Sequence, residues 1–180
     1  IIESDILHVL DMGADGIIFP QVSTVKDIEK IIQHTKFAPI GERGFNPFTT
    51  AGGYSSKQGS FFTNENSRIK TAIILEGQEG INNVDEILRN NQIDIVYIGQ
   101  YDLSIALGVP GEINHEKVLT TLDYLSKKIN AAGKIAGCMV HSVNEAKEFS
   151  MLGFHFLVYK VDSGLLFDTY KNFLKEMKTE

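Results

Sequence analysis

Short apolar segments alternate along this chain with longer segments in which apolar residues recur at helical spacing. The apolar segments lie at residues 16–20, 71–75, 93–98, 135–140 and 154–159. Each is followed by a stretch with apolar residues three or four positions apart, which is the pattern of an amphipathic helix. Strands that alternate with helices pair in parallel, because the helix serves as the crossover connection. The sequence therefore predicts an α/β fold built on a five-stranded parallel sheet.

The strands and their connections carry further signals. The strand segments are apolar throughout, which predicts strands buried on both faces of the sheet. Residues 39–60 are rich in glycine and contain proline, and they are expected to form a long functional or mobile loop. Thr24 and Ser142 are expected to cap helices, because an acid follows each of them three residues later. Helical spacing of apolar residues predicts further helices over 2–12, 81–88, 118–129 and 165–177.

Two parallel architectures fit this alternation, a doubly wound sheet and a (β/α)8 barrel. A doubly wound sheet that binds a dinucleotide carries a glycine-rich turn after its first strand. Here the first strand ends in Phe19, Pro20 and Gln21, and no such turn follows. A (β/α)8 barrel instead places functional residues at the C-terminal ends of successive strands. The barrel therefore predicts reactive side chains at these strand ends.

Two acidic residues lie at the C-terminal ends of neighbouring predicted strands. Glu76 directly follows the apolar run 73–75, and Asp102 lies just past 97–99 at the start of a helix. Neighbouring parallel strands lie about 4.8 Å apart, so both carboxylates are expected within reach of one ion. Two carboxylates, water and a bidentate substrate suit a hard cation such as Mg²⁺ or Mn²⁺. The alternative is a surface acid at Glu76 and a helix N-cap at Asp102, and spacing alone leaves it open.

Several spaced motifs resemble those of the HpcH/HpaI aldolase family, which includes relatives of the citrate lyase β-subunit. The segment IVYIGQYDLSIALGVPG (95–111) resembles the family signature IGxxDLSxxxGxxG. Five further segments resemble family motifs in the same order, at residues 9–24, 38–44, 75–79, 131–140 and 161–166. The ordered series is more specific than any one motif, and it covers nearly the whole chain.

This resemblance implies a TIM (β/α)8-barrel fold, with residues 1–180 as a single domain that covers about the last five strand-helix units. It implies a class II, pyruvate-dependent lyase that cleaves 4-hydroxy-2-oxo acids to pyruvate and an aldehyde. The family's catalytic histidine–aspartate pair and its arginine are expected on strands that precede residue 1. Two alternatives stay open: an acyl-CoA ester lyase or citrate-forming enzyme of the same fold, and a catalytically inactive barrel fragment.

The resemblance also assigns roles to individual residues. Glu76 and Asp102 fall on the two metal-ligand positions, and the main-chain N–H groups of Tyr101 and Asp102 fall where the family binds the pyruvate carboxylate. Asp11 falls on an acid that supports the family's active site, and it is our candidate catalytic residue, with a surface acid at the C-terminal end of a helix as its alternative. Arg43 lies in the glycine-rich segment. It is expected either to bind a substrate anion or to fasten the loop to the barrel.

Composition bounds the partners of the protein. The net charge of −6 argues against nucleic acid as a main partner, because phosphate binding needs a clustered basic surface. No apolar run approaches the length of a membrane span. Cys138 is the single cysteine, which fits a reducing cytoplasm. The apolar face predicted for residues 165–177, together with the family resemblance, favours a homo-oligomer.

Other residues have roles that are expected from their place in the sequence. His141 follows a strand and is a candidate for substrate contact, with a rim or capping role as its alternative. Cys138 is expected to be a buried, inert thiol. The pair Phe61-Phe62 is expected to pack rather than to recognise a ligand.

Overall fold

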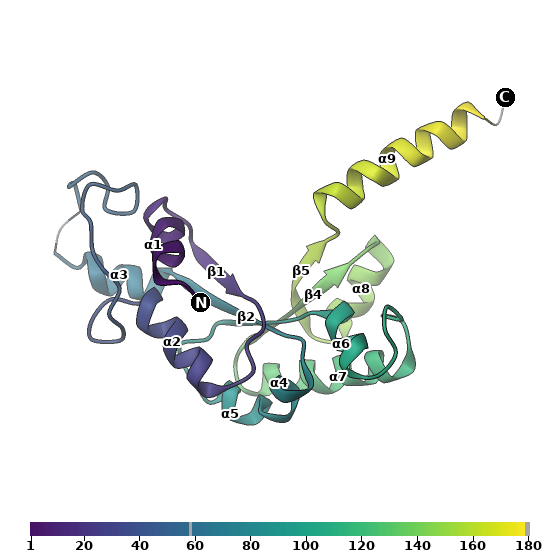
Figure 1. Cartoon of the computed structure of the whole chain (residues 1–180), viewed down its shortest axis with the longest axis horizontal. Helices are drawn as coiled ribbons and strands as arrows, with labels where there is room; N and C mark the ends of the chain where they lie inside the picture. Colours follow the sequence, from purple (N-terminus) through teal and green to yellow (C-terminus); the bar gives the residue numbers. More distant parts are fainter. Residues whose placement is uncertain (58, 179–180) are drawn as a thin grey trace.

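The computed structural model describes residues 1–57 and 59–178. In this part of the chain the strands form one parallel sheet in the order β1-β2-β3-β4-β5, so every strand pairs with its neighbours in sequence (Figure 1). The elements, in chain order, are α1 (Glu3–Asp11), β1 (Gly16–Phe19), α2 (Val25–Thr35), α3 (Phe61–Arg68), β2 (Lys70–Leu75), α4 (Gln78–Asn82), α5 (Val84–Leu88), β3 (Ile95–Ile98), α6 (Gln100–Ala106), α7 (Glu116–Ala131), β4 (Ile135–Val140), α8 (Val143–Met151), β5 (Phe154–Tyr159) and α9 (Asp162–Met177). The predicted five-stranded parallel sheet is therefore confirmed.

Helices cover one side of the sheet and form the core with it. Figure 1 shows α2, α5 and α7 along the lower side of the sheet, while the other side is open between α1 and α9. On the covered side Ile73, Leu75, Val96 and Ile98 are fully buried and belong to one hydrophobic cluster. This burial removes apolar surface from water and is the main source of the stability of the fold.

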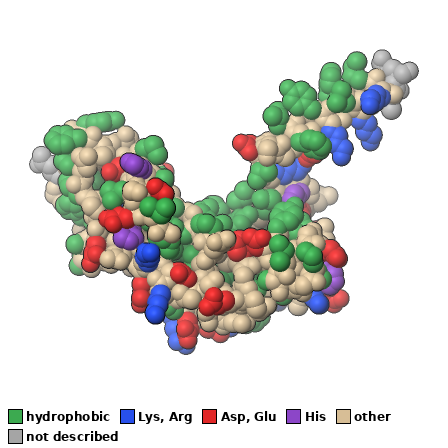
Figure 2. Space-filling model, viewed as in Figure 1, with side chains coloured by type: hydrophobic (Ala, Val, Ile, Leu, Met, Phe, Trp, Pro, Cys, Tyr) green, Lys and Arg blue, Asp and Glu red, His purple; other side chains and the backbone are tan. Residues whose placement is uncertain are grey.

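The prediction that the strands are buried on both faces is wrong for the uncovered side. Ile18 and Ile135 are 41% and 43% exposed. Within the described residues, no helix packs over this side, so alternate strand residues keep contact with solvent. Figure 2 shows the resulting hollow, with apolar side chains along its floor.

The expected helix caps are found in the structure. The Thr24 hydroxyl accepts a hydrogen bond from the Asp27 N–H, and the Asp27 carboxylate accepts from the Thr24 N–H, which completes a capping box. Ser142 likewise accepts from the Glu145 N–H. The Glu145 carboxylate, however, accepts from the N–H of His141 rather than from that of Ser142.

The segment between α2 and β2 differs most from its prediction. It ends in helix α3, which helical spacing did not indicate because only its first two residues are large and apolar. Phe61 and Phe62 pack edge-on or tilted against Phe37 and Phe45, with ring centroids 4.9 to 5.9 Å apart. The packing role expected for the phenylalanine pair is confirmed, and this aromatic cluster holds the segment against α2.

None of the helices in the described part of the chain has the length and apolar character that crossing a bilayer requires.

Candidate active site

The register of β2 and β3 sets the position of Glu76. Leu75 pairs with Ile98, so the next residues on the two strands, Glu76 and Gly99, lie side by side at the C-terminal edge of the sheet. A Cβ placed on Gly99 would lie 2.6 Å from Glu76 Oε2 and 3.0 Å from Glu76 Cβ. Glycine at this position therefore makes room for the Glu76 carboxylate.

A backbone group two residues past the end of β1 fixes the other carboxylate oxygen. The N–H of Gln21 donates to Glu76 Oε1 at 3.0 Å. Gln21 has a φ of 56°, which is uncommon for a residue with a side chain. No sequence motif assigns a role to Gln21 or Gly99. The only available signal was that both follow a predicted strand at the same edge of the sheet.

Asp102 lies in the first turn of α6, a helix that the core holds firmly. Leu103 and Ser104 are fully buried, and the Ser104 hydroxyl donates to the Tyr101 carbonyl and accepts from the Gly111 N–H. Gly99 occupies the N-cap position, with no side-chain cap. The alternative of Asp102 as the helix N-cap is therefore wrong. The first N–H groups of α6 have no intrahelical partner because a helix begins there.

The electrostatics of Glu76 reflect both burial and the second acid. Burial raises the pKa of Glu76 above its ordinary value, and the nearby Asp102 carboxyl raises it further through its charge and a hydrogen bond. The Gln21 N–H opposes this shift. Two carboxyl groups this close repel each other when both are ionised, and a cation between them relieves that repulsion.

The acid pair fits a hard divalent cation of the Mg²⁺ type. Among the residues that the structure describes, no group of three or more His, Cys, Asp or Glu side chains could hold a metal ion. A closed, all-protein metal site is therefore not formed by this part of the chain. Mg²⁺ commonly takes one or two carboxylates and completes its coordination with water and substrate oxygens. Glu76 and Asp102 match that donor set.

The structure does not bring Asp11 and Arg43 to this acid pair. Asp11 ends α1 and precedes β1, whereas Gln21 and Glu76 lie beyond the other end of the same strand. Arg43 Nη2 donates to Asp11 Oδ1 at 3.1 Å, and the guanidinium lies 4.5 Å over the Phe37 ring. Its side chain is 1% exposed, and burial lowers its pKa despite the Asp11 partner.

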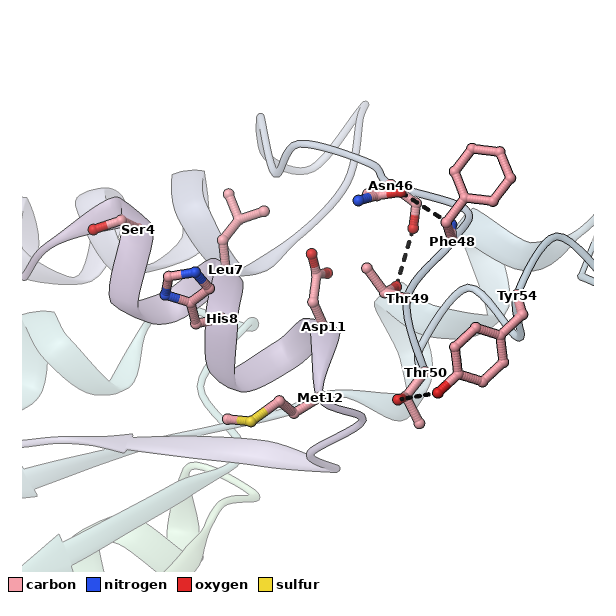
Figure 3. Close-up of a pocket in the computed structure, with 10 residues that line it drawn as sticks. All are labelled: Ser4, Leu7, His8, Asp11, Met12, Asn46, Phe48, Thr49, Thr50 and Tyr54. Carbon is pink, nitrogen blue, oxygen red and sulfur yellow. Dashed lines mark hydrogen bonds between the residues drawn. The ribbon is translucent and has the colours of Figure 1, made fainter.

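Asp11 lines a separate pocket of about 640 Å³ between α1 and the loop 46–54 (Figure 3). Figure 3 shows Asp11 at the end of the helix facing Asn46 and Thr49 on the loop, with Leu7 and His8 further back along the same helix. Arg43 lies in the loop that follows α2, where its own N–H donates to the Lys36 carbonyl, and its side chain pairs with Asp11 at the end of α1. This pair fastens the loop, as the second sequence-based reading of Arg43 predicts.

Tyr101 directly precedes Asp102 in α6, and His141 directly follows β4. Tyr101 is 50% exposed, and it lines a pocket of about 560 Å³ with His141, Met139 and residues of α9. The His141 ring lies 3.2 Å from a Glu145 oxygen through Nδ1. Polar side chains thus follow the C-terminal ends of three neighbouring strands: Glu76 after β2, Asp102 after β3 and His141 after β4.

A parallel sheet in sequential strand order, with helices on one side of it, is the arrangement of a TIM-barrel type of α/β protein. The sequence model of the HpcH/HpaI aldolase/citrate lyase family matches residues 1–169, and the chain belongs to this family.

The relatives of the chain agree with this assignment. The chain is 29% identical over 174 residues to the 2-keto-3-deoxy-L-rhamnonate aldolase of Escherichia coli K12. The match covers 97% of this chain and 65% of that enzyme. The chain therefore spans slightly less than two thirds of the length of this curated relative.

Solved structures show the same fold. The HpcH/HpaI aldolase from Desulfitobacterium hafniense superposes with a TM-score of 0.93 at 22% identity, over 99% of this chain and 69% of that one. A citrate lyase β subunit from M. tuberculosis, complexed with oxaloacetate and magnesium, superposes with a TM-score of 0.59 at 13% identity, over 89% of this chain and 62% of that one.

Proposed function

We propose that the protein is a metal-dependent carbon–carbon lyase that cleaves a 4-hydroxy-2-oxo acid to pyruvate and an aldehyde. The observation that carries the proposal is the pairing of Glu76 and Asp102 at the C-terminal edge of the sheet, with Gly99 leaving space between the strands. Aldolase activity in the Escherichia coli relative supports it. We propose that residues 1–180 form the C-terminal portion of a single barrel domain.

Glu76 and Asp102 are the proposed metal ligands, and Mg²⁺ or Mn²⁺ is the proposed ion. The magnesium in the citrate lyase β subunit complex supports this choice. When bound, such a cation supplies Lewis-acid stabilisation of the charge that develops on the keto oxygen of the substrate. The Gln21 N–H holds Glu76 Oε1, so Oε2, the oxygen next to Gly99, would be the one free to hold the ion.

The main-chain N–H groups of Tyr101 and Asp102 are the proposed binding site for the substrate carboxylate. They lie in the first turn of α6, where a helix presents donors and the positive end of its dipole. For Asp11 and Arg43 we propose a positioning role in place of direct catalysis and substrate binding. Their buried ion pair holds the loop that follows α2.

The exposed side chains of α9 and the single cysteine bear on the assembly and the location of the protein. We propose a homo-oligomer, because α9 has no buried residue and exposes an apolar set consisting of Leu165, Leu166, Phe167, Tyr170, Phe173, Leu174 and Met177. Figure 2 shows these side chains along the upper edge of the helix, with basic side chains along its lower edge. A cytoplasmic location is proposed from the single cysteine, which forms no disulfide within the chain.

The test is the exchange of pyruvate methyl protons in D₂O, followed by proton NMR with and without Mn²⁺. This assay needs no assumption about the aldehyde. We expect exchange that requires the metal and that is lost in Glu76→Gln. Glu79→Gln is the matched control, since Glu79 is an exposed acid three residues along the chain. Exchange that persists in Glu76→Gln, or an absence of both exchange and Mn²⁺ binding in the wild type, would refute the proposal.

A further inference from the structure

A histidine lies at the C-terminal end of β4, on the uncovered side of the sheet. Met139 and His141 both line the cavity of about 560 Å³ between α6, the ends of β4 and β5, and the start of α9. Alternate residues of a strand point to the same face of a sheet, so His141 continues the row of Met139 at the strand end. Tyr101, which precedes the proposed metal ligand Asp102 by one residue, belongs to the same wall. His141 therefore faces a space that adjoins the acid pair.

The strand register places this histidine close to Glu76. Tyr97 on β3 pairs with Gly137 on β4. Continued along both strands, this register puts His141 one strand over from Gly99 and two residues further toward the C-terminal end. With strands about 4.8 Å apart and a rise of about 3.3 Å per residue, the backbones of Gly99 and His141 lie roughly 8 Å apart. A substrate of a few carbon atoms that is held at Glu76 can therefore reach the His141 ring.

Glu145 orients the His141 ring. Glu145 Oε2 lies 3.2 Å from Nδ1 of the ring, and it also accepts from the His141 N–H. A carboxylate only accepts hydrogen bonds, so in the neutral ring Nδ1 carries the proton and Nε2 keeps its lone pair. Nε2 has no hydrogen-bond partner within residues 1–57 and 59–178, and the side chain is 32% exposed. A carboxylate on one ring nitrogen and a free lone pair on the other is the arrangement of a histidine base.

The other polar groups of the cavity wall are less suited to accept a proton. The Lys160 ammonium has no lone pair, and its Nζ donates to Asp168 Oδ2 at 2.6 Å. This ion pair lowers the pKa of the Asp168 carboxyl, which makes its carboxylate a weaker base. Tyr101 offers a neutral phenol. Within the described wall, His141 is therefore the group that can take up a proton near neutral pH.

Cleavage of a 4-hydroxy-2-oxo acid needs a base at the C4 oxygen. The C4 hydroxyl loses its proton, and the electrons of its O–H bond form the C4=O double bond of the aldehyde. The C3–C4 bond breaks, and its electron pair becomes the C2=C3 double bond of the pyruvate enolate, which leaves the negative charge on the C2 oxygen. A proton from water then adds to C3 and gives pyruvate.

We propose that His141 is the base that takes the proton of the C4 hydroxyl, through Nε2, and later returns this proton to water. Glu145 is its positioning residue. The inference rests on the proposed function, because the acid pair must hold the 2-oxo acid end of the substrate. It competes with two alternatives. One is a histidine base on strands that precede residue 1, as the family resemblance implies, and the other is a structural ring that only secures the start of α8.

The experiment compares two reactions of the same protein in the presence of Mn²⁺. One is cleavage of 4-hydroxy-2-oxopentanoate, followed by the release of pyruvate, and the other is the exchange of pyruvate methyl protons in D₂O. Only the first involves a C4 hydroxyl. In His141→Gln, kcat for cleavage should fall by roughly 10²–10⁴-fold, the usual contribution of a general base, while exchange stays at the wild-type rate. His155→Gln is the matched control, since His155 is an exposed histidine near the N-terminal end of β5, and it should change neither reaction.

Chemical rescue separates a base from a structural ring. His141→Ala leaves room for free imidazole, which should restore part of the cleavage rate. The restored rate should rise with the basicity of substituted imidazoles, because proton transfer follows the strength of the base. Glu145→Gln keeps an acceptor for Nδ1 and removes its charge. It should lower kcat for cleavage by a smaller factor than His141→Gln does and leave exchange unchanged.

The outcomes also separate the two proposals. Cleavage at the wild-type rate in His141→Gln, an equal loss of cleavage and exchange in that variant, or a rescued rate that does not depend on basicity overturns the role of His141. Exchange without cleavage in the wild type overturns it as well. Absence of both metal-dependent reactions in the wild type refutes the lyase itself.

Discussion

The carboxylate of Glu76 occupies the space that a side chain on Gly99, at the neighbouring strand end, would need. An added Cβ at Gly99 would stand 2.6 Å from Oε2 of that carboxylate and 3.2 Å from Cγ2 of Ile74. The strand register brings the two residues together, since Leu75 and Ile98 are paired just before them. The side-chain space at Gly99 is therefore part of the proposed metal site.

Replacing Gly99 by alanine should weaken Mn²⁺ binding by roughly ten- to a hundredfold, the usual effect of disturbing a group that orients a ligand. The end of the glutamate side chain can rotate away from the new methyl group, so the expected loss of stability is only about 1 kcal/mol. Calorimetric titration with Mn²⁺ measures the first effect and thermal unfolding the second.

Gly77→Ala is the matched control for this change. Gly77 also adjoins Glu76, but a Cβ there meets no atom within 4 Å, and its φ of −108° suits any residue. Equal Mn²⁺ affinity in Gly99→Ala and wild type would show that Gly99 does not make room for a metal ligand.

Glu76→Gln should stabilise the metal-free protein at neutral pH. Burial and the Asp102 carboxyl raise the pKa of Glu76 above its ordinary value of 4.5, so the folded state binds a proton more tightly than the unfolded chain. The free energy of unfolding therefore falls as the pH rises from the ordinary pKa through the raised pKa. Above that pH window the ionised Glu76 carboxylate destabilises the folded state. Glutamine removes this cost and can still accept from the Gln21 N–H.

Thermal unfolding in EDTA, followed from pH 4 to pH 8, measures this effect. The advantage of Glu76→Gln should be largest at pH 8 and shrink toward pH 4, where the wild-type carboxyl is protonated. Glu79→Gln, an exposed change of the same kind, should show no such trend. A variant that is less stable than the wild type at pH 8 would contradict the raised pKa.

Cys138 should resist thiol reagents in the folded protein. Its side chain is fully buried on β4, and burial, followed by the charge of Glu145, raises the pKa of its thiol to about 12. Because the thiolate is the reactive form, native protein at pH 8 should react with a disulfide reagent only as fast as the core opens. In denaturant one thiol per chain should react at once, since Cys138 is the single cysteine. Rapid labelling of the native protein would contradict the inert assignment.

Lys36→Met should lower the free energy of unfolding by about 1–3 kcal/mol, the cost of leaving buried carbonyl groups unpaired. Lys36 is 2% exposed, and its Nζ donates to the carbonyls of Asn66 and Ile69 at 2.8 and 2.6 Å. Methionine keeps the length of the side chain and removes the donors. Urea unfolding measures the loss, and Lys26→Met, an exposed change on α2, should be close to neutral.

Phe173→Glu should reduce the mass of the assembly that the protein forms in solution. Phe173 is 59% exposed within the apolar set of α9, and a carboxylate there would oppose burial of that face against another copy. Asn172→Glu adds the same charge to the neighbouring position, outside the apolar set, and should leave association unchanged. Sedimentation velocity measures the mass. A wild-type protein that sediments as a monomer would refute the proposed oligomer.

The sequence by itself determined the order and type of most of the elements. Alternating apolar runs mark the strands at 71–75 and 135–140, because local periodicity records which residues face the core. The same pattern, with the resemblance of 95–111 to a family signature, located Glu76 and Asp102 at neighbouring strand ends. The helix α3 escaped this reasoning, because packing against Phe37 and Phe45 stabilises it more than its own pattern does.

Only the tertiary structure decided how side chains distant in sequence meet. It placed the Gln21 N–H on Glu76 and showed that Gly99 leaves room for the carboxylate. It also paired Asp11 with Arg43 away from Glu76. A contact between strands depends on register and side-chain direction, which no local pattern encodes. The sequence thus specified which residues are available for chemistry, and the fold decided which of them act together.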